Sequence, residues 1–414
     1  MSTGKFQLRH PALALILAVV AGSGAIFGIV NELILTDSDH TLLTFLPLAG
    51  DNAIADRGYR KLLSGQVEGP GGAIEVFQQA LRINVASPYR WCDLGEAYLA
   101  AKHPQKAYYC ITQAVRLGPQ IPPILMRASN VCLREGKLSQ AALYTSRILS
   151  LVPDYDNIIF SSYYRFGLDA HYVLNQALSA DSRAFQSYFR YLLRQSQQTA
   201  LQEAWAYGLP RGYWDDGIAD DYARSLGQAK KYEAAAAVWA DRMRTRDPDY
   251  PKSNRVFNGG FEFEPTGALF DWRLSPVEGA KIARDTASAS GNWSLRVQFD
   301  GTENLSFAQV SQYVFVTPGD YRFQASIRTE GITTDQGVGL RISDSENPGP
   351  PLYETERFLG THGWTKVEKT IQAGPKTKLL YVELVRSPSL RFDCKIAGTV
   401  WIDAVSLRPI AATR

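Results

Sequence analysis

The feature that most constrains the fold is a 34-residue pattern of small and large apolar residues between Pro88 and Ile121. These residues recur on one side of each of two predicted helices: Trp91, Leu94, Gly95 and Tyr98 on the first, and Ala107, Ile111 and Ala114 on the second. Pro119 then ends the second helix. Because two such antiparallel helices cannot bury their apolar faces alone, the pattern predicts a stack of helix pairs.

The same spacing continues on both sides of this window. The matching residues are Ala73, Phe77 and Ala80 before it, Ala128, Cys132, Gly136, Ala141 and Pro153 in the window 122–155, and Ala223, Leu226, Tyr232, Ala235 and Trp239 near the end. Over roughly residues 55–250 the chain resembles tetratricopeptide repeat proteins. The resemblance implies an α-solenoid whose groove binds a protein partner, in the form of a helix or an extended segment.

Length and composition limit the possible classes of protein. A chain of 414 residues with 45% hydrophobic and 21% charged residues favours two or three folded domains. A formal net charge of +3 gives no support to nucleic-acid binding, which usually needs a clustered basic surface. The four cysteines have no CxxC spacing and the five histidines no HExxH spacing, so zinc-ribbon and zinc-protease sites are not expected.

The N-terminal segment predicts the compartment. Residues 1–10 contain Lys5 and Arg9, and residues 11–30 contain no charge, which is enough for a helix of about 30 Å, the thickness of one hydrocarbon core. We therefore predict a cytoplasmic tail at 1–10, a single-pass plasma-membrane anchor at 11–35 and a linker at 36–50. The alternative is a cleaved secretory signal with its site at residues 21–23. Both interpretations place the bulk of the chain outside the cytoplasm, in the periplasm of a bacterial-type envelope.

The pattern changes from helical to alternating near residues 247–251. Beyond that point, short alternating segments such as 295–299, 321–328 and 378–386 lie between Gly, Pro, Asn and Asp residues. This rhythm is typical of an antiparallel β-sandwich, and residues 256–409 have the length for eight to ten strands. The predicted fold is therefore multidomain α plus β, with helical repeats over 51–250 and a β-sandwich over 256–409.

Several short motifs in this last region occur in one order. They are Asn258-Gly259-Gly260-Phe261-Glu262, residues 291–297, Gln312, residues 318–321, residues 327–331, Gly363-Trp364 and residues 401–407. Together they resemble the family 4/9 carbohydrate-binding modules, which are galactose-binding-like jelly rolls. The resemblance implies sugar binding, although many domains with this sandwich bind other molecules or only pack against a neighbour.

The same resemblance implies a structural calcium ion that joins the first strand to the last. Glu262 and Asp403 match the positions that would supply carboxylates, and backbone carbonyls near Asn258 and Asp285 would complete the six to eight oxygen ligands. The alternative is that Glu262 and Asp403 accept hydrogen bonds from the backbone at one end of the sandwich.

A sugar site needs an aromatic platform and planar hydrogen-bonding groups. Strand alternation predicts one polar sheet face shared by Gln324, Arg328, Arg341, Tyr381 and Glu383. Trp272 and Tyr353, on predicted loops, would supply the stacking surface. The alternative interpretation is an ordinary solvated outer face.

These elements predict a non-catalytic, membrane-anchored adaptor of the cell envelope, whose repeats bind a protein and whose sandwich binds glycan, in assembly, export or retention of a surface polysaccharide. The alternative is a pure protein-interaction scaffold, with the sandwich as a packing domain. A glycan-cleaving enzyme is the third hypothesis, and the sequence contains no GxSxG, P-loop or GxGxxG motif in the expected context.

Overall fold

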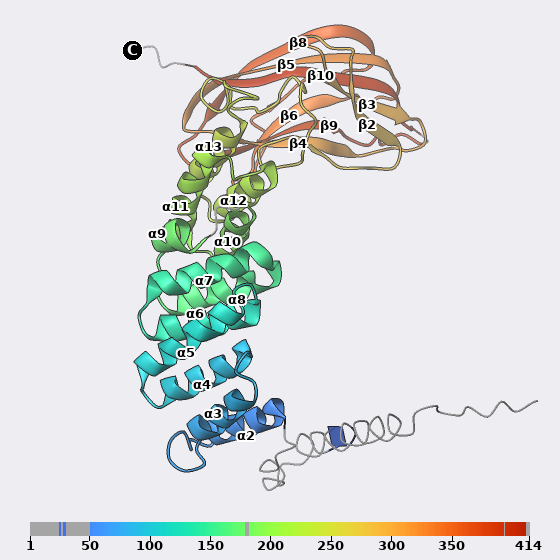
Figure 1. Ribbon diagram of the computed structural model, residues 1–414. Coiled ribbons are helices and arrows are strands. Elements are labelled where there is room, and N and C mark those ends of the chain that lie inside the picture. The colour runs from blue at the N-terminus through green and yellow to red at the C-terminus, as the bar shows by residue number, and fades with distance from the viewer. Residues whose placement is uncertain (1–24, 26–27, 30–49, 179–181, 393, 411–414) are drawn as a thin grey trace, which may run out of the picture. The chain divides into compact units, whose positions relative to one another are not determined.

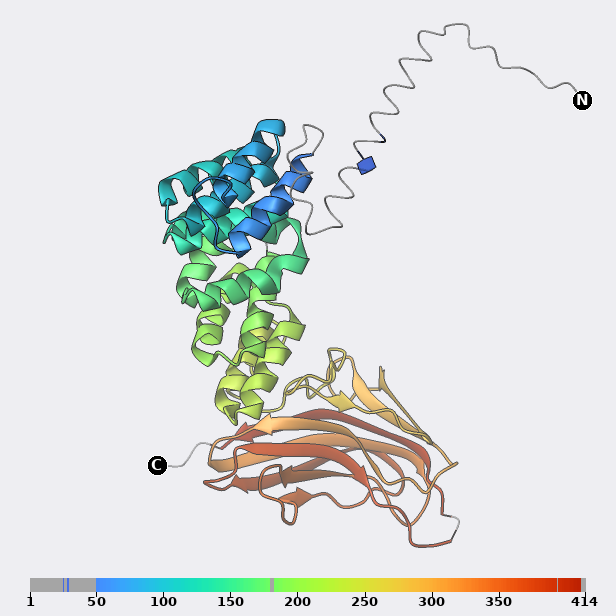
Figure 2. The ribbon, with the colours of Figure 1, turned by 90° about the horizontal axis from the view of Figure 1, so that it is seen from below.

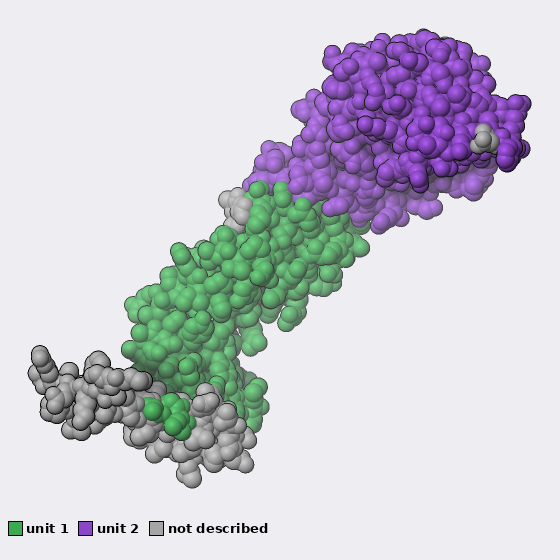
Figure 3. Space-filling model, turned by 90° about the vertical axis from the view of Figure 1, so that its right-hand side faces the viewer, with its two compact units in different colours: residues 1–205 green, residues 206–414 purple. Residues whose placement is uncertain are grey.

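The computed structural model describes residues 25, 28–29, 50–178, 182–392 and 394–410. Contacts within the chain divide it into two compact units, residues 1–205 and 206–414 (Figure 3). Of the predicted anchor at 11–35, only residues 25, 28 and 29 are among the described ones; the tail at 1–10 and the linker, apart from Gly50, lie outside them. No helix in the described ranges combines the length and apolar character needed to cross a bilayer.

The first unit is built from successive helices (Figures 1 and 2). They are α2 (Asp51–Leu63), α3 (Ala73–Ile83), α4 (Pro88–Ala100), α5 (Pro104–Leu117), α6 (Pro122–Arg134), α7 (Leu138–Leu151), η2 (Pro153–Tyr155), α8 (Asp156–Arg165), α9 (Ala170–Tyr172), η3 (Val173–Ala177), α10 (Ser182–Arg194) and α11 (Gln198–Gly208), whose last residues belong to the second unit. Helices α2 and α3, α4 and α5, and α6 and α7 pack as pairs, and each pair contacts the next. These pairs are consistent with the predicted helical repeat region, and the windows that begin at Pro88 and Pro122 each form a helix pair.

Two local features explain why the sequence forms these pairs. Pro88, Pro104 and Pro122 occupy the first positions of their helices, where a missing N–H costs nothing and the fixed φ favours the helix. At Gly95, an added Cβ would lie 3.3 Å from the carbonyl oxygen of Ala107, so the small residue allows α5 to approach α4 closely. The small positions of the sequence pattern are thus the places where paired helices touch.

The second unit begins with the end of α11 and continues with η4 (Leu209–Arg211), α12 (Asp216–Gln228) and α13 (Tyr232–Met243), which precede the sandwich. The predicted domains were helical to residue 250 and β-rich from residue 256. By contacts, however, α12 and α13 form one unit with the sandwich. The Trp239 ring lies 5.7 Å from that of Phe257, and the Asp220 carboxylate accepts a 2.7 Å hydrogen bond from the backbone N–H of Leu269. The last helix pair is therefore part of the body that contains the sandwich.

The sandwich has ten strands within the described residues. They are β1 (Arg273–Leu274), β2 (Ala280–Asp285), β3 (Ser294–Asp300), β4 (Phe307–Phe315), β5 (Gly319–Ile332), β6 (Gly339–Asp344), β7 (Tyr353–Glu354), β8 (Gly360–Ala373), β9 (Leu379–Arg386) and β10 (Ala397–Pro409). Sheet A has the order β1-β4-β9-β6-β7 and sheet B the order β2-β3-β10-β5-β8, with antiparallel pairing in both. Figure 1 shows them as two layers. The prediction of an antiparallel sandwich with eight to ten strands is confirmed.

The core of the sandwich lies between the two sheets. As the strand alternation predicts, the inward residues are fully or almost fully buried: Tyr321, Phe323, Ala325 and Ile327 on β5, and Leu380, Val382 and Leu384 on β9. Their neighbours in the sequence therefore point outward, and on sheet A these outward residues form the surface described next.

Candidate functional site

The outer face of sheet A carries a row of charged and polar residues that crosses all five strands. The strand register pairs Arg273 with Ser311, Ser311 with Glu383, Glu383 with Arg341, and Arg341 with Glu354. Because residues directly opposite each other on neighbouring strands share a face, these five side chains form one row. Arg341 donates from Nε to one oxygen of Glu383 at 3.0 Å, and its Nη2 forms an ion pair with the same oxygen at 3.0 Å. Glu383 is only 7% exposed, so its carboxylate is held in place.

Two tyrosines form an aromatic floor beside this row. Tyr313 on β4 and Tyr381 on β9 are paired in register, and their ring centroids lie 4.7 Å apart at an angle of 39°. The Tyr381 hydroxyl donates a 2.7 Å hydrogen bond to the hydroxyl of Ser311, which fixes the position of its ring. Both rings are half-buried, so each still presents part of its surface to solvent.

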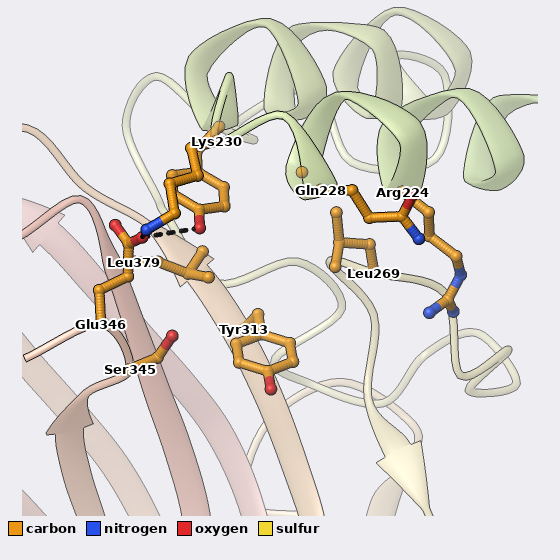
Figure 4. Close-up of a pocket in the computed structure, with 10 residues that line it drawn as sticks. Arg224, Gln228, Lys230, Leu269, Tyr313, Ser345, Glu346 and Leu379 are labelled. Atoms are coloured by element: carbon orange, nitrogen blue, oxygen red, sulfur yellow. Dashed lines mark hydrogen bonds and ion pairs between the residues drawn. The ribbon is translucent and has the colours of Figure 1, made fainter. Parts of the chain in front are cut away.

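The last helix pair forms a wall over one end of this floor. Between them lies a pocket of about 460 Å³. It is lined by Arg224, Gly227, Gln228, Lys230, Tyr232, Leu269, Tyr313, Ser345, Glu346 and Leu379. Figure 4 shows Lys230 and Glu346 on one flank and Arg224, Gln228 and Leu269 on the other, with Tyr313 from β4 between them. We call the Tyr313–Tyr381 floor, the charged row and this pocket the sheet A groove.

Hydrogen bonds hold the flanks of the groove in place. Glu346 accepts from the Tyr232 hydroxyl at 3.0 Å and pairs with the Lys230 ammonium at 3.1 Å, which joins α13 to the loop after β6 (Figure 4). Burial and the bond to Glu346 raise the pKa of Tyr232 to about 12, so its hydroxyl remains a donor at neutral pH. On the other flank, Arg224 bonds the Asp220 carboxylate and the carbonyl of Gly267, each at 2.7 Å.

The loop that carries Ser345 and Glu346 is ordered by Asp344. This carboxylate accepts from the Thr377 hydroxyl at 2.6 Å, from the side-chain amide of Asn347 at 2.9 Å and from the backbone N–H groups of Glu346 and Asn347. Burial alone raises the pKa of Asp344, but these hydrogen bonds outweigh it and hold the pKa below its ordinary value.

Four polar groups of the groove have no hydrogen-bond or ion-pair partner among the described residues. They are the guanidinium of Arg273, the side-chain amide of Gln228 and the hydroxyls of Ser345 and Tyr313. Arg273 instead lies beside Tyr313, with its guanidinium carbon 5.9 Å from the ring centroid. A pocket with an aromatic floor and unpaired polar groups around it has the chemistry to hold a ligand that is apolar on one face and rich in hydroxyls at its edges.

Only some of the predicted binding residues share this face. Arg341, Tyr381 and Glu383 do come together on sheet A. Gln324 and Arg328 lie on β5, and the topology places β5 between β10 and β8 in sheet B. There Gln324 donates to Glu368 at 2.7 Å, and Arg328 lies over Trp401 at 4.6 Å. The prediction that all five residues share one polar face is therefore wrong.

The two predicted stacking residues are not exposed on loops. Trp272 is fully buried, with its indole N–H donating to the carbonyl of Asn258 at 3.1 Å. Tyr353 pairs with the inward-facing Ile342 and packs its ring 5.9 Å from the core residue Phe323. Both predictions of exposed platforms are wrong, because these aromatic side chains contribute to the sandwich core instead.

The residues that sequence reasoning missed are Tyr313, Arg273 and the groove residues of the last helix pair. Alternation on β4 would have identified Tyr313, because Val310, Gln312 and Val314 are buried and Tyr313 lies between the last two. Nothing in the sequence pattern indicates that Arg224, Gln228 and Lys230 meet a sheet surface distant in the chain.

The predicted calcium ligands are engaged by hydrogen-bond donors. Asp403 is fully buried and accepts from the backbone N–H groups of Ala289 and Ser290 at 2.7 and 2.9 Å, and Glu262 accepts from those of Asn292 and Trp293 at 2.8 and 3.2 Å. These hydrogen bonds match the alternative of two carboxylates that bind the backbone at one end of the sandwich. Calcium at Glu262 and Asp403 stays a prediction, because the ion needs further oxygen ligands around the same point. No cluster of three or more His, Cys, Asp or Glu side chains in the described part of the chain could hold a metal ion.

No protein-family model matches the chain, and no curated protein matches it. Solved structures similar to its C-terminal part include carbohydrate-binding modules. A family 61 module in complex with β-1,4-galactotriose is 21% identical, with a TM-score of 0.28, and the match covers 38% of this chain and 99% of the module. A family 4 module is 12% identical over 37% of this chain and 99% of its own, with a TM-score of 0.28. The first family 22 xylan-binding domain of Paenibacillus barcinonensis Xyn10C is 14% identical, with a TM-score of 0.26, and the match covers 39% of this chain and 98% of that domain.

Proposed function

We propose that the sheet A groove binds a glycan and that the chain is a non-catalytic adaptor of the cell envelope. The observation that carries this proposal is the Tyr313–Tyr381 floor, bordered by polar groups with no partner among the described residues. Sugar rings stack their C–H faces on aromatic rings, and their hydroxyls pair with guanidinium, amide and hydroxyl groups. The groove offers both kinds of contact within one surface.

The groove is ordered by contacts within the chain. Tyr381 is held by Ser311, Arg341 by Glu383, and the Glu346 flank by Tyr232 and Lys230. Because binding costs less conformational entropy when the contacting side chains are already fixed, such order favours affinity for a ligand with few strong contacts.

Affinity electrophoresis of the full chain through gels that contain different polysaccharides tests this proposal. We expect retardation by at least one polysaccharide and a loss of affinity of about tenfold or more in Tyr313→Ala, since a central aromatic contact typically contributes more than about 1.4 kcal/mol. Tyr164→Ala is the matched control, because this tyrosine is 65% exposed on α8 in the other unit. If no polysaccharide retards the chain, or if both variants behave alike, glycan binding at the groove is refuted and the scaffold alternative is favoured.

We also propose that the helical repeats are of the tetratricopeptide type and bind a protein partner. The first helices of successive pairs, α2, α4 and α6, contact one another, and Arg127 joins them through bonds to Asp93 and to the Tyr59 hydroxyl at 2.8 and 3.0 Å. A photo-crosslinking residue in place of Glu96 on α4 should capture a specific envelope protein, whereas the same residue in place of Arg116, on the exposed side of α5, should not. Equal capture at both positions would contradict a partner that binds specifically to the groove of the helical repeats.

The cellular role that we propose rests on the N-terminal segment as well as on the groove. We propose that residues 11–35 anchor the chain in the plasma membrane, that its bulk is periplasmic, and that it acts in the assembly, export or retention of a surface polysaccharide. A reporter enzyme active only outside the cytoplasm, fused after Arg414, should be active. Loss of that activity when Val19 and Val20 are replaced by aspartate would support export through this segment, and unchanged activity would contradict it.

We propose no catalysis at the groove. Glu383 is bound by Arg341, and Glu346 by Lys230 and Tyr232, whereas a glycosidase needs one carboxyl group that is protonated and one that is free to attack or activate water. Release of reducing ends from a retarding polysaccharide by the purified chain would contradict this assignment.

A further inference from the structure

We infer that the sheet A groove selects acidic saccharides, and that Arg273 is the residue that recognises their carboxylate. This inference rests on the proposed glycan binding and names the class of glycan. Its evidence is the charge pairing within the groove, taken together with the position of Arg273 beside the aromatic floor.

Three of the four cations of the groove are already neutralised by a carboxylate. Arg224 is paired with Asp220 at 2.7 Å, Lys230 with Glu346 at 3.1 Å, and Arg341 with Glu383 at 3.0 Å. At the far end of the charged row, Glu354 is paired with Arg357. None of these carboxylates is left free to repel an anionic ligand.

Arg273 is the exception among these cations. It is exposed on β1 and has no ion pair among the described residues. Its guanidinium lies 5.9 Å from the Tyr313 ring centroid, within cation–π distance, so it is directed toward the floor of the groove. The groove therefore carries one uncompensated positive charge next to its stacking surface.

A uronic acid residue has the chemistry that matches this arrangement. Its ring would stack on Tyr313, and its carboxylate would accept two parallel hydrogen bonds from the planar guanidinium of Arg273. A neutral sugar in the same place would leave this charge without a partner. The hydroxyl of Ser345 and the amide of Gln228, also without partners in the described chain, remain for the sugar hydroxyls.

An edge-strand cation can have another role, because charges on edge strands prevent a sheet from pairing with another chain. That role does not depend on where the guanidinium lies relative to Tyr313. Under it, removal of the Arg273 charge would promote self-association without changing the affinity for any glycan. The two roles are therefore separable by binding measurements on monomeric protein.

The experiment compares one polyuronate with the same polymer after chemical reduction of its carboxyl groups. Affinity is measured with the full chain for the wild type, Arg273→Gln, Tyr313→Ala and Lys281→Gln. The last variant is the matched control: it removes one exposed positive charge from the same sandwich, but on β2 of sheet B. Monomer content is checked by light scattering.

We expect the wild type to prefer the polyuronate. Arg273→Gln should lower that affinity by at least about tenfold, because the variant loses both charge-assisted hydrogen bonds, and it should leave affinity for the reduced polymer unchanged. Lys281→Gln should bind as the wild type does. Equal affinity of the wild type for the two polymers, or equal loss in Arg273→Gln and Lys281→Gln, would overturn the inference. If the inference is overturned in either way but Tyr313→Ala still loses binding, the proposed glycan binding at the groove is retained. If the wild type binds neither polymer nor any other glycan, both proposals fail.

Discussion

Replacement of Trp272 by alanine provides a direct test of whether this residue belongs to the core or to a binding platform. Trp272 directly precedes β1 and is fully buried, with its ring 5.0 Å from that of Phe261. Its indole N–H donates to the carbonyl of Asn258, whose side chain in turn holds Phe263 through hydrogen bonds of 2.8 and 3.1 Å. The indole therefore fills the core and supports the opening segment of the sandwich.

The expected cost follows from these contacts. Truncation of a buried Trp to Ala typically lowers the free energy of unfolding by about 3–5 kcal/mol. Loss of the hydrogen bond to Asn258 adds about 1 kcal/mol, so the expected total is about 4–6 kcal/mol. Since whole domains are stable by about 5–15 kcal/mol, Trp272→Ala should leave the second unit only marginally folded. Trp272→Phe keeps much of the packing and should cost about 1–3 kcal/mol.

The assay is denaturant unfolding followed by near-ultraviolet circular dichroism, combined with polysaccharide retardation of the variant that remains folded. We expect Trp272→Ala to shift the transition of the sandwich strongly to lower denaturant, and folded Trp272→Phe to bind polysaccharide as the wild type does. An alanine variant with wild-type stability but without glycan binding would refute the assignment to the core and restore the stacking role predicted from the sequence.

Two further predictions concern carboxylates. Asp403→Ala removes the fully buried carboxylate that accepts from the backbone N–H groups of Ala289 and Ser290, and it should cost about 2–4 kcal/mol in denaturant unfolding. Addition of calcium or its chelation should leave the wild-type transition unchanged. Stabilisation by calcium would contradict the view that Asp403 serves only to bind the backbone. Asp344 has a lowered folded-state pKa, so its contribution is present above the unfolded pKa of about 3.9 and is lost as pH falls through the lower folded value. The free energy of unfolding of the wild type should therefore exceed that of Asp344→Asn by its largest amount at pH 7, and this difference should shrink as the pH falls below about 4. A constant difference over this range would contradict the direction of the pKa shift.

The sequence was most informative where one local pattern determines the structure. The small residues and the prolines of the window at Pro88 predict both the helix pair and its ends, because the close approach at Gly95 and the helix starts depend on those residues alone. Strand alternation likewise predicts which residues of β5 and β9 face the core, since the side-chain direction on a strand reverses at every residue.

The candidate site was less predictable because it depends on which strands become neighbours. Alternation shows correctly that Arg328 and Arg341 both point outward, but it contains no information on sheet membership. Two outward residues of a sandwich face opposite directions when their strands belong to different sheets. For the same reason the aromatic content of a segment does not distinguish a platform from a core residue: Trp272 and Tyr313 are both aromatic, and only their places in the sheet assign one to the interior and the other to the surface.

The role of the last helix pair follows from the same dependence on neighbours. A sandwich alone presents sheet A as an open surface, on which a single sugar ring would contact little beyond Tyr313 and Tyr381. The contacts of Tyr232 and Lys230 with Glu346, and of Arg224 with the loop at Gly267, place α12 and α13 beside that surface and turn one end of it into a pocket. Because a pocket buries more of a ligand than a flat surface does, the helices should increase both affinity and the restriction on ligand shape. If the sheet A groove binds a glycan as proposed, movement of this helix pair relative to the sheet would change the affinity, because the pocket exists only while the helices stay beside the sheet.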